Sequence, residues 1–211
     1  MTSIDGLLNK PRGARALYVL AHGAGAGMRH AFLEEVSERL GEAKIATFRY
    51  EFPYMQEGRR RPDTPRVLQE TVRAAVEAAR KKAPQLPLIA GGKSMGGRMT
   101  SLAASQEPLP NVEGIAFLGF PLHAPGRAGD ERANHLEDVD LPMLFVQGTR
   151  DSLADLGRIT GVCTRLGKKA TLHVVDGGDH SFKVLKRSGR DSADVMQEIV
   201  QAVASWVTAI R

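Results

Sequence analysis

Six short apolar runs, separated by stretches of helical periodicity, constrain the fold of this chain more than any other feature. Hydrophobicity within each run is nearly continuous rather than alternating, which is typical of strands that are buried on both faces of a parallel sheet. The runs cover residues 17–20, 45–48, 88–90, 115–118, 143–146 and 172–175.

The segments between these runs predict helices. Apolar residues recur at intervals of three or four within 32–40, 68–79 and 195–210, and residues 99–105 and 153–166 also favour helix. This alternation predicts a three-layer α/β fold with a mainly parallel, doubly wound sheet of about six strands. The 211 residues fit a single domain, 1–211. In such sheets ligands bind beyond the carboxyl ends of the strands, so the residues that follow each strand are the candidates for function.

Composition and charge exclude several classes of protein. The net charge is +5, but 24 acidic residues are interspersed with 29 basic ones and only 11 residues are aromatic, so we expect no nucleic-acid partner. The densest basic cluster, Arg59–Arg60–Arg61, lies in a long loop at 51–66 that we expect to be solvated and mobile. No apolar run is long enough to cross a membrane, and the absence of a secretory pattern makes the cytoplasm the expected compartment. A single cysteine and scattered histidines predict neither a disulfide nor a metal site, and we expect no cofactor.

The strongest local motif is Gly92-Lys93-Ser94-Met95-Gly96, which follows the third strand and precedes a helix. This is the G-x-S-x-G pattern in the strand–turn–helix context that exposes a nucleophilic serine. A phosphate-binding loop is the alternative interpretation of Gly92-Lys93-Ser94, but that motif requires glycine at position 87, where Pro87 stands.

A glycine-rich loop, His22-Gly23-Ala24-Gly25-Ala26-Gly27, follows the first strand. We expect it to supply one backbone N–H of an oxyanion hole, from Ala24 or Gly25, while the N–H of Met95 supplies the other. A dinucleotide-binding loop is the alternative, but its third glycine would fall at Met28, and no acidic residue closes the second strand.

Asp151 follows the fifth strand and His180 follows the sixth. Together with Ser94 they have the Ser…Asp…His order of a catalytic triad, each member lying beyond a different strand. His180 would act as the base toward Ser94, and Asp151 would orient the imidazole. Asp176 and Asp179 are the alternatives for the acid, and Asp151 alone could instead be a helix cap.

Six segments then resemble one known family: HGAGAG, FRYEFPYM, GGKSMGGR, GFPLHAPG, QGTRD and DGGDHSF. They are similar to small α/β-hydrolases of the dienelactone-hydrolase-like group, and more closely to its bacterial branch related to Tex30 and KANSL-type proteins. The resemblance implies Ser94, Asp151 and His180 as the triad. The fifteen or so residues before the first strand imply that the antiparallel start of the full fold is largely missing. The connection at 120–142 is too short for a lid domain, which implies an open, shallow site.

Two functions remain open at this point. The first is a serine hydrolase that cleaves small ester or thioester substrates through an acyl-enzyme. The second is a non-catalytic interaction protein on a hydrolase scaffold, because some relatives are subunits of larger assemblies. Four residues are candidates for substrate contact, each with loop packing or a surface ion pair as its alternative: His123, Tyr54, Met55 and Arg98. Lys93 and the Arg59–Arg61 cluster could attract an acidic substrate. Nothing in the sequence indicates an oligomeric state.

Overall fold

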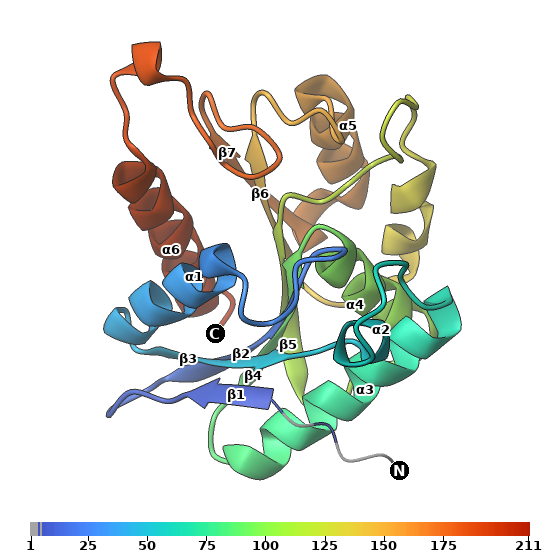
Figure 1. Cartoon of the computed structure of the whole chain (residues 1–211), viewed down its shortest axis with the longest axis vertical. Coiled ribbons are helices and arrows are strands. Elements are labelled where there is room, and N and C mark those ends of the chain that lie inside the picture. The colour runs from blue at the N-terminus through green and yellow to red at the C-terminus, as the bar shows by residue number, and fades with distance from the viewer. Residues whose placement is uncertain (1–3, 5) are drawn as a thin grey trace.

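A seven-stranded sheet forms the centre of the molecule in the computed structural model, which describes Ile4 and residues 6–211. The strand order is β1-β3-β2-β4-β5-β6-β7, and β1 alone is antiparallel to its neighbour (Figure 1). The strands are β1 (Gly6–Asn9), β2 (Ala16–Ala21), β3 (Ile45–Tyr50), β4 (Leu88–Lys93), β5 (Val112–Leu118), β6 (Met143–Gly148) and β7 (Ala170–Val175).

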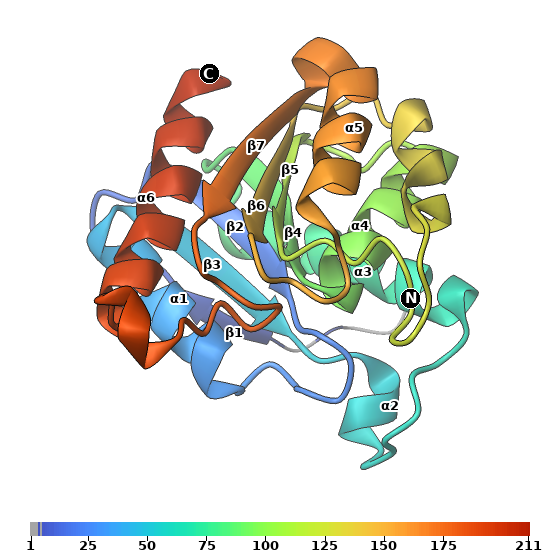
Figure 2. The same cartoon turned by 90° about the horizontal axis from the view of Figure 1, so that it is seen from above.

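Helices cover both faces of this sheet, which confirms the three-layer α/β prediction. Helices α1 (Ala31–Glu42) and α6 (Ser192–Ala209) lie on one face. Helices α3 (Pro65–Lys82), α4 (Met95–Gln106) and α5 (Leu156–Leu166) lie on the other, as Figures 1 and 2 both show.

The continuous hydrophobicity of the strands results from two separate cores. In β2, Leu17 and Val19 point into the core beneath α3 and α4, whereas Tyr18 and Leu20 point into the core beneath α1 and α6. Because both faces are covered by helices, every residue of this strand is buried.

Several details differ from the sequence-based expectation. The antiparallel start is reduced to one four-residue strand, β1, which pairs along β3 as a seventh strand. Three of its residues are half-buried and Leu8 is exposed, which is too weak a pattern to identify from the sequence. The loop at 51–66 contains a short helix, α2 (Pro53–Gln56). The connection at 120–142 contains a 3-10 helix, η1 (Glu131–Asp138). The helix expected at 153–166 begins only at Leu156, where the Asp155 side chain caps it by accepting the N–H of Arg158. Two short 3-10 helices remain: η2 (Gly167–Lys169) precedes β7, and η3 (Lys186–Ser188) precedes α6.

Strand β3 lies on one side of β2, whereas β4 and all later strands lie on the other side. The strand order therefore reverses between β2 and β4, which are adjacent and parallel. At such a reversal, the loops that follow the two strands diverge and leave a crevice at the carboxyl edge of the sheet. The His22–Gly27 loop follows β2 and Ser94 follows β4, so both candidate segments meet at this edge.

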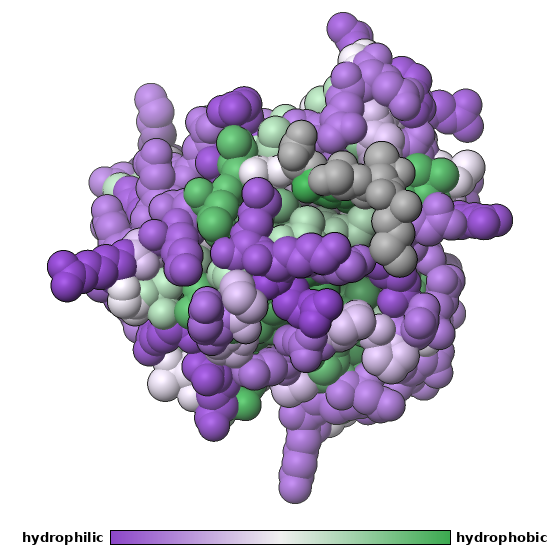
Figure 3. Space-filling model, turned by 90° about the horizontal axis from the view of Figure 1, so that it is seen from below, coloured by the Kyte–Doolittle hydropathy of each residue, from purple (hydrophilic) through white to green (hydrophobic). Residues whose placement is uncertain are grey.

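Few large hydrophobic side chains of the described residues are exposed; these are Leu8, Val174 and Leu185. The face seen from below in Figure 3 is dominated by hydrophilic side chains, with hydrophobic residues in small separate patches. Within the described part of the chain, no helix is both long and apolar enough to cross a bilayer.

Candidate active site

Ser94 lies on a tight turn between β4 and α4. Its backbone has φ 50° and ψ −115°, a sparsely populated conformation for a residue with a side chain. Two glycines permit the turn because they pack closely against the backbone of Ala21 and His22. A Cβ atom at Gly92 would come within 2.2 Å of the Ala21 oxygen, and a Cβ atom at Gly96 would come within 2.5 Å of the His22 oxygen. The turn therefore holds the Ser94 hydroxyl out from the end of the strand.

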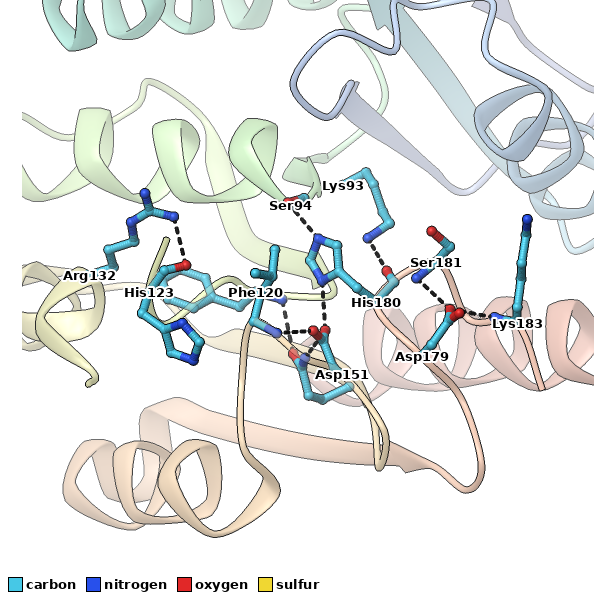
Figure 4. A network of polar contacts seen from close by, with 12 residues as sticks. Lys93, Ser94, Phe120, His123, Arg132, Asp151, Asp179, His180, Ser181 and Lys183 are labelled. Atoms are coloured by element: carbon cyan, nitrogen blue, oxygen red, sulfur yellow. Dashed lines mark hydrogen bonds and ion pairs between the residues drawn. The ribbon is translucent and has the colours of Figure 1, made fainter. Parts of the chain in front are cut away.

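The Ser94 hydroxyl contacts the ring of His180, and the ring contacts Asp151 (Figure 4). His180 Nε2 lies 2.8 Å from Ser94 Oγ, and its Nδ1 lies 2.7 Å from Asp151 Oδ2. The Asp151 side chain is fully buried, whereas that of His180 is 22% exposed. The three residues come from the loops after β4, β6 and β7, as expected, and the geometry can pass a proton from the hydroxyl to the imidazole.

The other two carboxylates near His180 in sequence face elsewhere. Asp179 Oδ1 accepts the N–H groups of Ser181 and Lys183 within its own loop. Asp176 lies 3.4 Å from the Thr149 hydroxyl. Asp151 is therefore the carboxylate that contacts the imidazole.

Gln147, the penultimate residue of β6, is a site residue that the sequence analysis missed. Its amide Nε2 donates to Asp151 Oδ2 at 2.5 Å, and its Oε1 accepts the Phe120 N–H at 2.9 Å. A carboxylate only accepts and a backbone N–H only donates, so these two partners fix the orientation of the amide. Gln147 thus orients the buried carboxylate. A glutamine within an otherwise apolar strand is the sequence feature that could have identified this role.

Lys93, the last residue of β4, contacts the backbone of His180. Its Nζ donates to the His180 carbonyl oxygen at 2.5 Å and lies 5.3 Å from the centre of the Phe182 ring. Burial lowers the pKa of Lys93 to about 8, although Asp151 and Asp179 oppose this shift. The sequence suggested only that Lys93 could attract an acidic substrate, and it did not predict this contact with the His180 backbone.

The glycine-rich loop after β2 lies directly beside the serine. A Cβ atom on Gly23 would lie 3.8 Å from the Ser94 Cβ. The Gly25 N–H donates to the Tyr54 hydroxyl at 2.9 Å. Among the described residues, no acceptor is found for the N–H of Ala24 or of Met95. Of the two residues expected to contribute to an oxyanion hole from this loop, Ala24 is therefore the one whose backbone N–H has no acceptor in the described part of the chain.

His22 anchors the start of this loop. The side chain is fully buried, Nε2 accepts the Phe52 N–H at 3.1 Å, and Nδ1 lies 2.7 Å from the Gly23 oxygen. These partners require a neutral ring protonated on Nδ1. Burial also lowers the pKa of His22, which favours the same neutral form.

The four candidate substrate contacts have different surroundings. Tyr54 is fully buried and supports the glycine-rich loop, and half-buried Met55 packs near Gly27 in the same region. His123 follows β5, and its Nδ1 lies 3.0 Å from the Ala124 oxygen. Arg98 is half-buried on α4, and its Nε has no hydrogen-bond partner among the described residues.

Neither of two surface hollows, of about 530 and 830 Å³, includes Ser94, Asp151 or His180. Within the described residues, no group of three or more histidine, cysteine, aspartate or glutamate side chains is arranged to hold a metal ion.

Comparisons with solved structures identify the fold. Dienelactone hydrolase from Anabaena variabilis superimposes with a TM-score of 0.75 at 20% identity, covering 97% of this chain and 90% of that chain. A lidless α/β serine hydrolase from Xanthomonas campestris gives a TM-score of 0.72 at 19% identity, covering 98% and 96%. The esterase domain of a Rhodothermus marinus protein gives 0.71 at 14% identity, covering 98% and 92%.

The family comparison covers almost the whole sequence. The profile of the alpha/beta hydrolase domain family matches residues 14–208, which span every described element except β1 and Ala209, the last residue of α6. The chain belongs to the alpha/beta hydrolase domain family.

Proposed function

We propose that this protein is a serine esterase that hydrolyses small carboxylic esters or thioesters through an acyl-enzyme intermediate. The observation that carries the proposal is the continuous contact from Ser94 Oγ through the His180 ring to Asp151. Within the hydrolase group we propose the branch related to Tex30 and KANSL-type proteins, a single domain over 1–211, and a cytoplasmic location without membrane, nucleic-acid or cofactor requirements.

In the proposed mechanism, His180 Nε2 removes the proton of Ser94 Oγ as the oxygen attacks the ester carbonyl. Asp151 accepts a hydrogen bond from the Nδ1–H of the ring, which fixes the tautomer and stabilises the imidazolium. His180 then returns the proton to the leaving alcohol or thiol. Water hydrolyses the acyl-enzyme by the same route in reverse.

The negative charge on the carbonyl oxygen needs donors beside Ser94. We assign these to the backbone N–H groups of Met95 and Ala24, because the Gly25 N–H already donates to Tyr54. Met95 begins α4, so the positive end of the helix dipole adds to this stabilisation.

The first test is labelling with a fluorophosphonate, followed by a series of p-nitrophenyl esters of increasing acyl length. The native protein should be labelled, whereas Ser94→Ala should not be labelled and should lose at least about a thousandfold in kcat. Ser105→Ala, near the other end of α4, is the matched control and should behave as the native protein.

Two results would refute the proposal. One is equal labelling of the native and Ser94→Ala proteins. The other is the absence of both labelling and ester hydrolysis, which would favour a non-catalytic interaction protein.

A further inference from the structure

The carboxylate of Glu51 contacts the last residues of the glycine-rich loop. Glu51 directly follows β3, and its Oε1 accepts the Met28 N–H at 3.1 Å. The same oxygen lies against Gly27, where an added Cβ atom would come within 2.8 Å of it and where the φ of 73° also disfavours a side chain. The glycine therefore allows the end of the loop to approach this carboxylate closely.

The same carboxylate also lies beside the start of the loop. Glu51 Oε1 is 3.6 Å from Nε2 of the fully buried His22 ring. Burial lowers the pKa of His22, whereas the Gly23 carbonyl and the charge of Glu51 oppose this shift. A single oxygen atom thus contacts both ends of the loop, at His22 and at Met28, and Ala24 lies between these ends.

Two other side chains after or within β3 hold the loop at single points. Arg49 Nη1 donates to the Met28 carbonyl oxygen at 3.0 Å, so that Met28 is held through both its N–H and its C=O. The Tyr54 hydroxyl accepts the Gly25 N–H. Of these three side chains, Glu51 is the one that contacts both ends of the loop.

A surface ion pair does not explain the position of Glu51. Among the described residues, no lysine or arginine nitrogen lies within 4 Å of its carboxylate, and its side chain is only 16% exposed. Arg49, two residues earlier, lies 3.5 Å from Glu34 instead. The hydrogen bond from the Met28 N–H is therefore the principal polar contact of this carboxylate.

The direction of the Ala24 N–H depends on the conformation of this loop. Gly25 and Gly27 both have positive φ, and a segment so rich in glycine has many alternative conformations in the absence of outside contacts. A donor of an oxyanion hole is effective only when it lies about 2.7–3.1 Å from the position of the oxyanion. A group that joins the two ends of the loop restricts the residues between them to one conformation.

We propose that Glu51 is a positioning residue for the oxyanion hole: it joins the two ends of the 22–28 loop and thereby directs the Ala24 N–H toward the carbonyl oxygen of the substrate. This inference rests on the esterase activity proposed above. Glu51 acts through the loop and not on the substrate. The feature that matters is the acceptor oxygen, and the negative charge is secondary.

Two substitutions separate the acceptor from the charge. Glu51→Gln keeps an acceptor oxygen at the same place on the side chain and removes the charge, whereas Glu51→Met has a similar length and removes both. Glu51→Met should lower kcat/KM for p-nitrophenyl butyrate about tenfold or more, a part of the loss expected when one oxyanion donor is removed outright. Glu51→Gln should stay within about threefold of the native value.

A thiono ester provides a readout that general destabilisation does not change. O-(p-nitrophenyl) thionobutyrate carries sulfur in place of the carbonyl oxygen, and sulfur is a weak hydrogen-bond acceptor, so its cleavage depends little on the oxyanion hole. The ratio of kcat/KM for the oxygen ester to that for the thiono ester should fall about tenfold or more in Glu51→Met and stay near native in Glu51→Gln. Equal losses on the two esters would overturn the inference.

Asp191→Ala is the matched control. Asp191 caps α6 by accepting the Asp194 N–H at 2.8 Å, so this variant also removes a carboxylate that accepts a backbone N–H. It should lower the melting temperature by about 2–4 °C and leave the ratio for the two esters at the native value.

Hydrogen exchange separates this inference from the proposed esterase. Backbone amides of residues 23–30 should exchange about fivefold or more faster in Glu51→Met than in the native or Glu51→Gln protein, while those of α6 exchange equally in all three. If the native protein cleaves no ester, the esterase proposal fails and the exchange measurement alone decides whether Glu51 holds the loop. Native exchange rates for residues 23–30 in Glu51→Met would overturn the inference.

Discussion

At the scale of single residues, the contact between Lys93 and the His180 carbonyl joins the end of β4 to the loop after β7. The half-buried ammonium group lies 5.3 Å from the centre of the Phe182 ring, and the charges of Asp151 and Asp179 act on its pKa. This burial links the stability of the protein to pH.

The pKa of Lys93 is lowered to about 8, against 10.5 for an unperturbed lysine. Between these two values the unfolded chain binds a proton that the folded protein has released, so the free energy of unfolding gains a contribution that rises with pH. Below pH 8 both states are protonated and the contribution is flat. Urea unfolding from pH 7 to 10 should therefore show native protein gaining stability relative to Lys93→Met, by at most about 1.4 kcal/mol per pH unit.

Lys183→Met is the control for this measurement. Lys183 is exposed in the same loop, so its removal should leave the pH dependence of stability unchanged. A native-minus-Lys93→Met difference that is flat or falls above pH 8 would contradict the prediction.

The three residues that contact one another in the site could be predicted from the sequence, whereas the residues that hold Asp151 and His180 in position could not. Ser94, Asp151 and His180 could be identified because each follows its own strand in a recognised order. Gln147 and Lys93 act through contacts between loops that are distant in sequence, and such contacts leave no spacing pattern. The choice between Ala24 and Gly25 depended on the Tyr54 hydroxyl, whose position is set by tertiary packing.

At the scale of elements, the short helix α2 supports the glycine-rich loop. Tyr54 lies on α2, its backbone N–H donates to Asp63 at 3.0 Å, and its hydroxyl accepts the Gly25 N–H. The segment that precedes α3 thus braces the loop to which we assign the Ala24 donor.

Tyr54→Phe should lower kcat about three- to tenfold on neutral esters, because loss of this acceptor loosens the loop that carries Ala24. Stability should fall by about 1 kcal/mol, the usual contribution of one buried hydrogen bond. Steady-state kinetics and urea unfolding give both quantities.

Tyr18→Phe is the matched control for Tyr54→Phe. Tyr18 is fully buried in β2 and its hydroxyl donates to the Ala116 oxygen at 2.8 Å, within the sheet. Its removal should have a similar effect on stability and leave kcat unchanged. If both variants lose kcat equally, Tyr54 has no particular role in the loop.

The elements could be predicted where burial produces a strong pattern. All six apolar runs are strands of the sheet. In central strands such as β2, helices on both faces require apolar residues throughout, whereas β7 lies at an edge and is only partly buried. Strand β1 lies at an edge with half-buried side chains, and α2 has four residues that begin with Pro53, so neither is long enough to produce a period.

At the scale of the whole molecule, the packing around the C-terminal part of α6 lies far from the candidate site. The only tryptophan, Trp206, lies over Gly114 near the start of β5, at the opposite end of the sheet from Ser94. A Cβ atom at Gly114 would come within 2.6 Å of the Trp206 ring and 3.2 Å of the Pro142 oxygen.

Gly114→Ala should therefore lower the free energy of unfolding by about 1–3 kcal/mol through overpacking, with little effect on ester kinetics. Trp206 fluorescence during urea unfolding provides the measurement. Gly161→Ala is the contrasting control: in α5 a Cβ atom meets nothing within 4 Å, and this change should increase stability by about 0.5–1 kcal/mol. A destabilising Gly161→Ala or a neutral Gly114→Ala would contradict this account of the packing.

The overall architecture followed from the alternation of elements, whereas the exact strand order did not. Periodicity predicts a doubly wound sheet, but it does not place β4 beside β2 rather than beside β3. The position of the crevice between the loops after β2 and β4 depends on that order.

The reactive groups are spread along the chain, from residue 94 to residue 180, and the last of them follows the final strand. A polypeptide emerging from the ribosome carries the serine long before the imidazole has been synthesised. In the proposed mechanism the serine is therefore no more nucleophilic during translation than an ordinary alcohol, and its reactivity toward acyl groups should begin only after the C-terminal part of the protein has docked. Proteolytic removal of that part should abolish this reactivity.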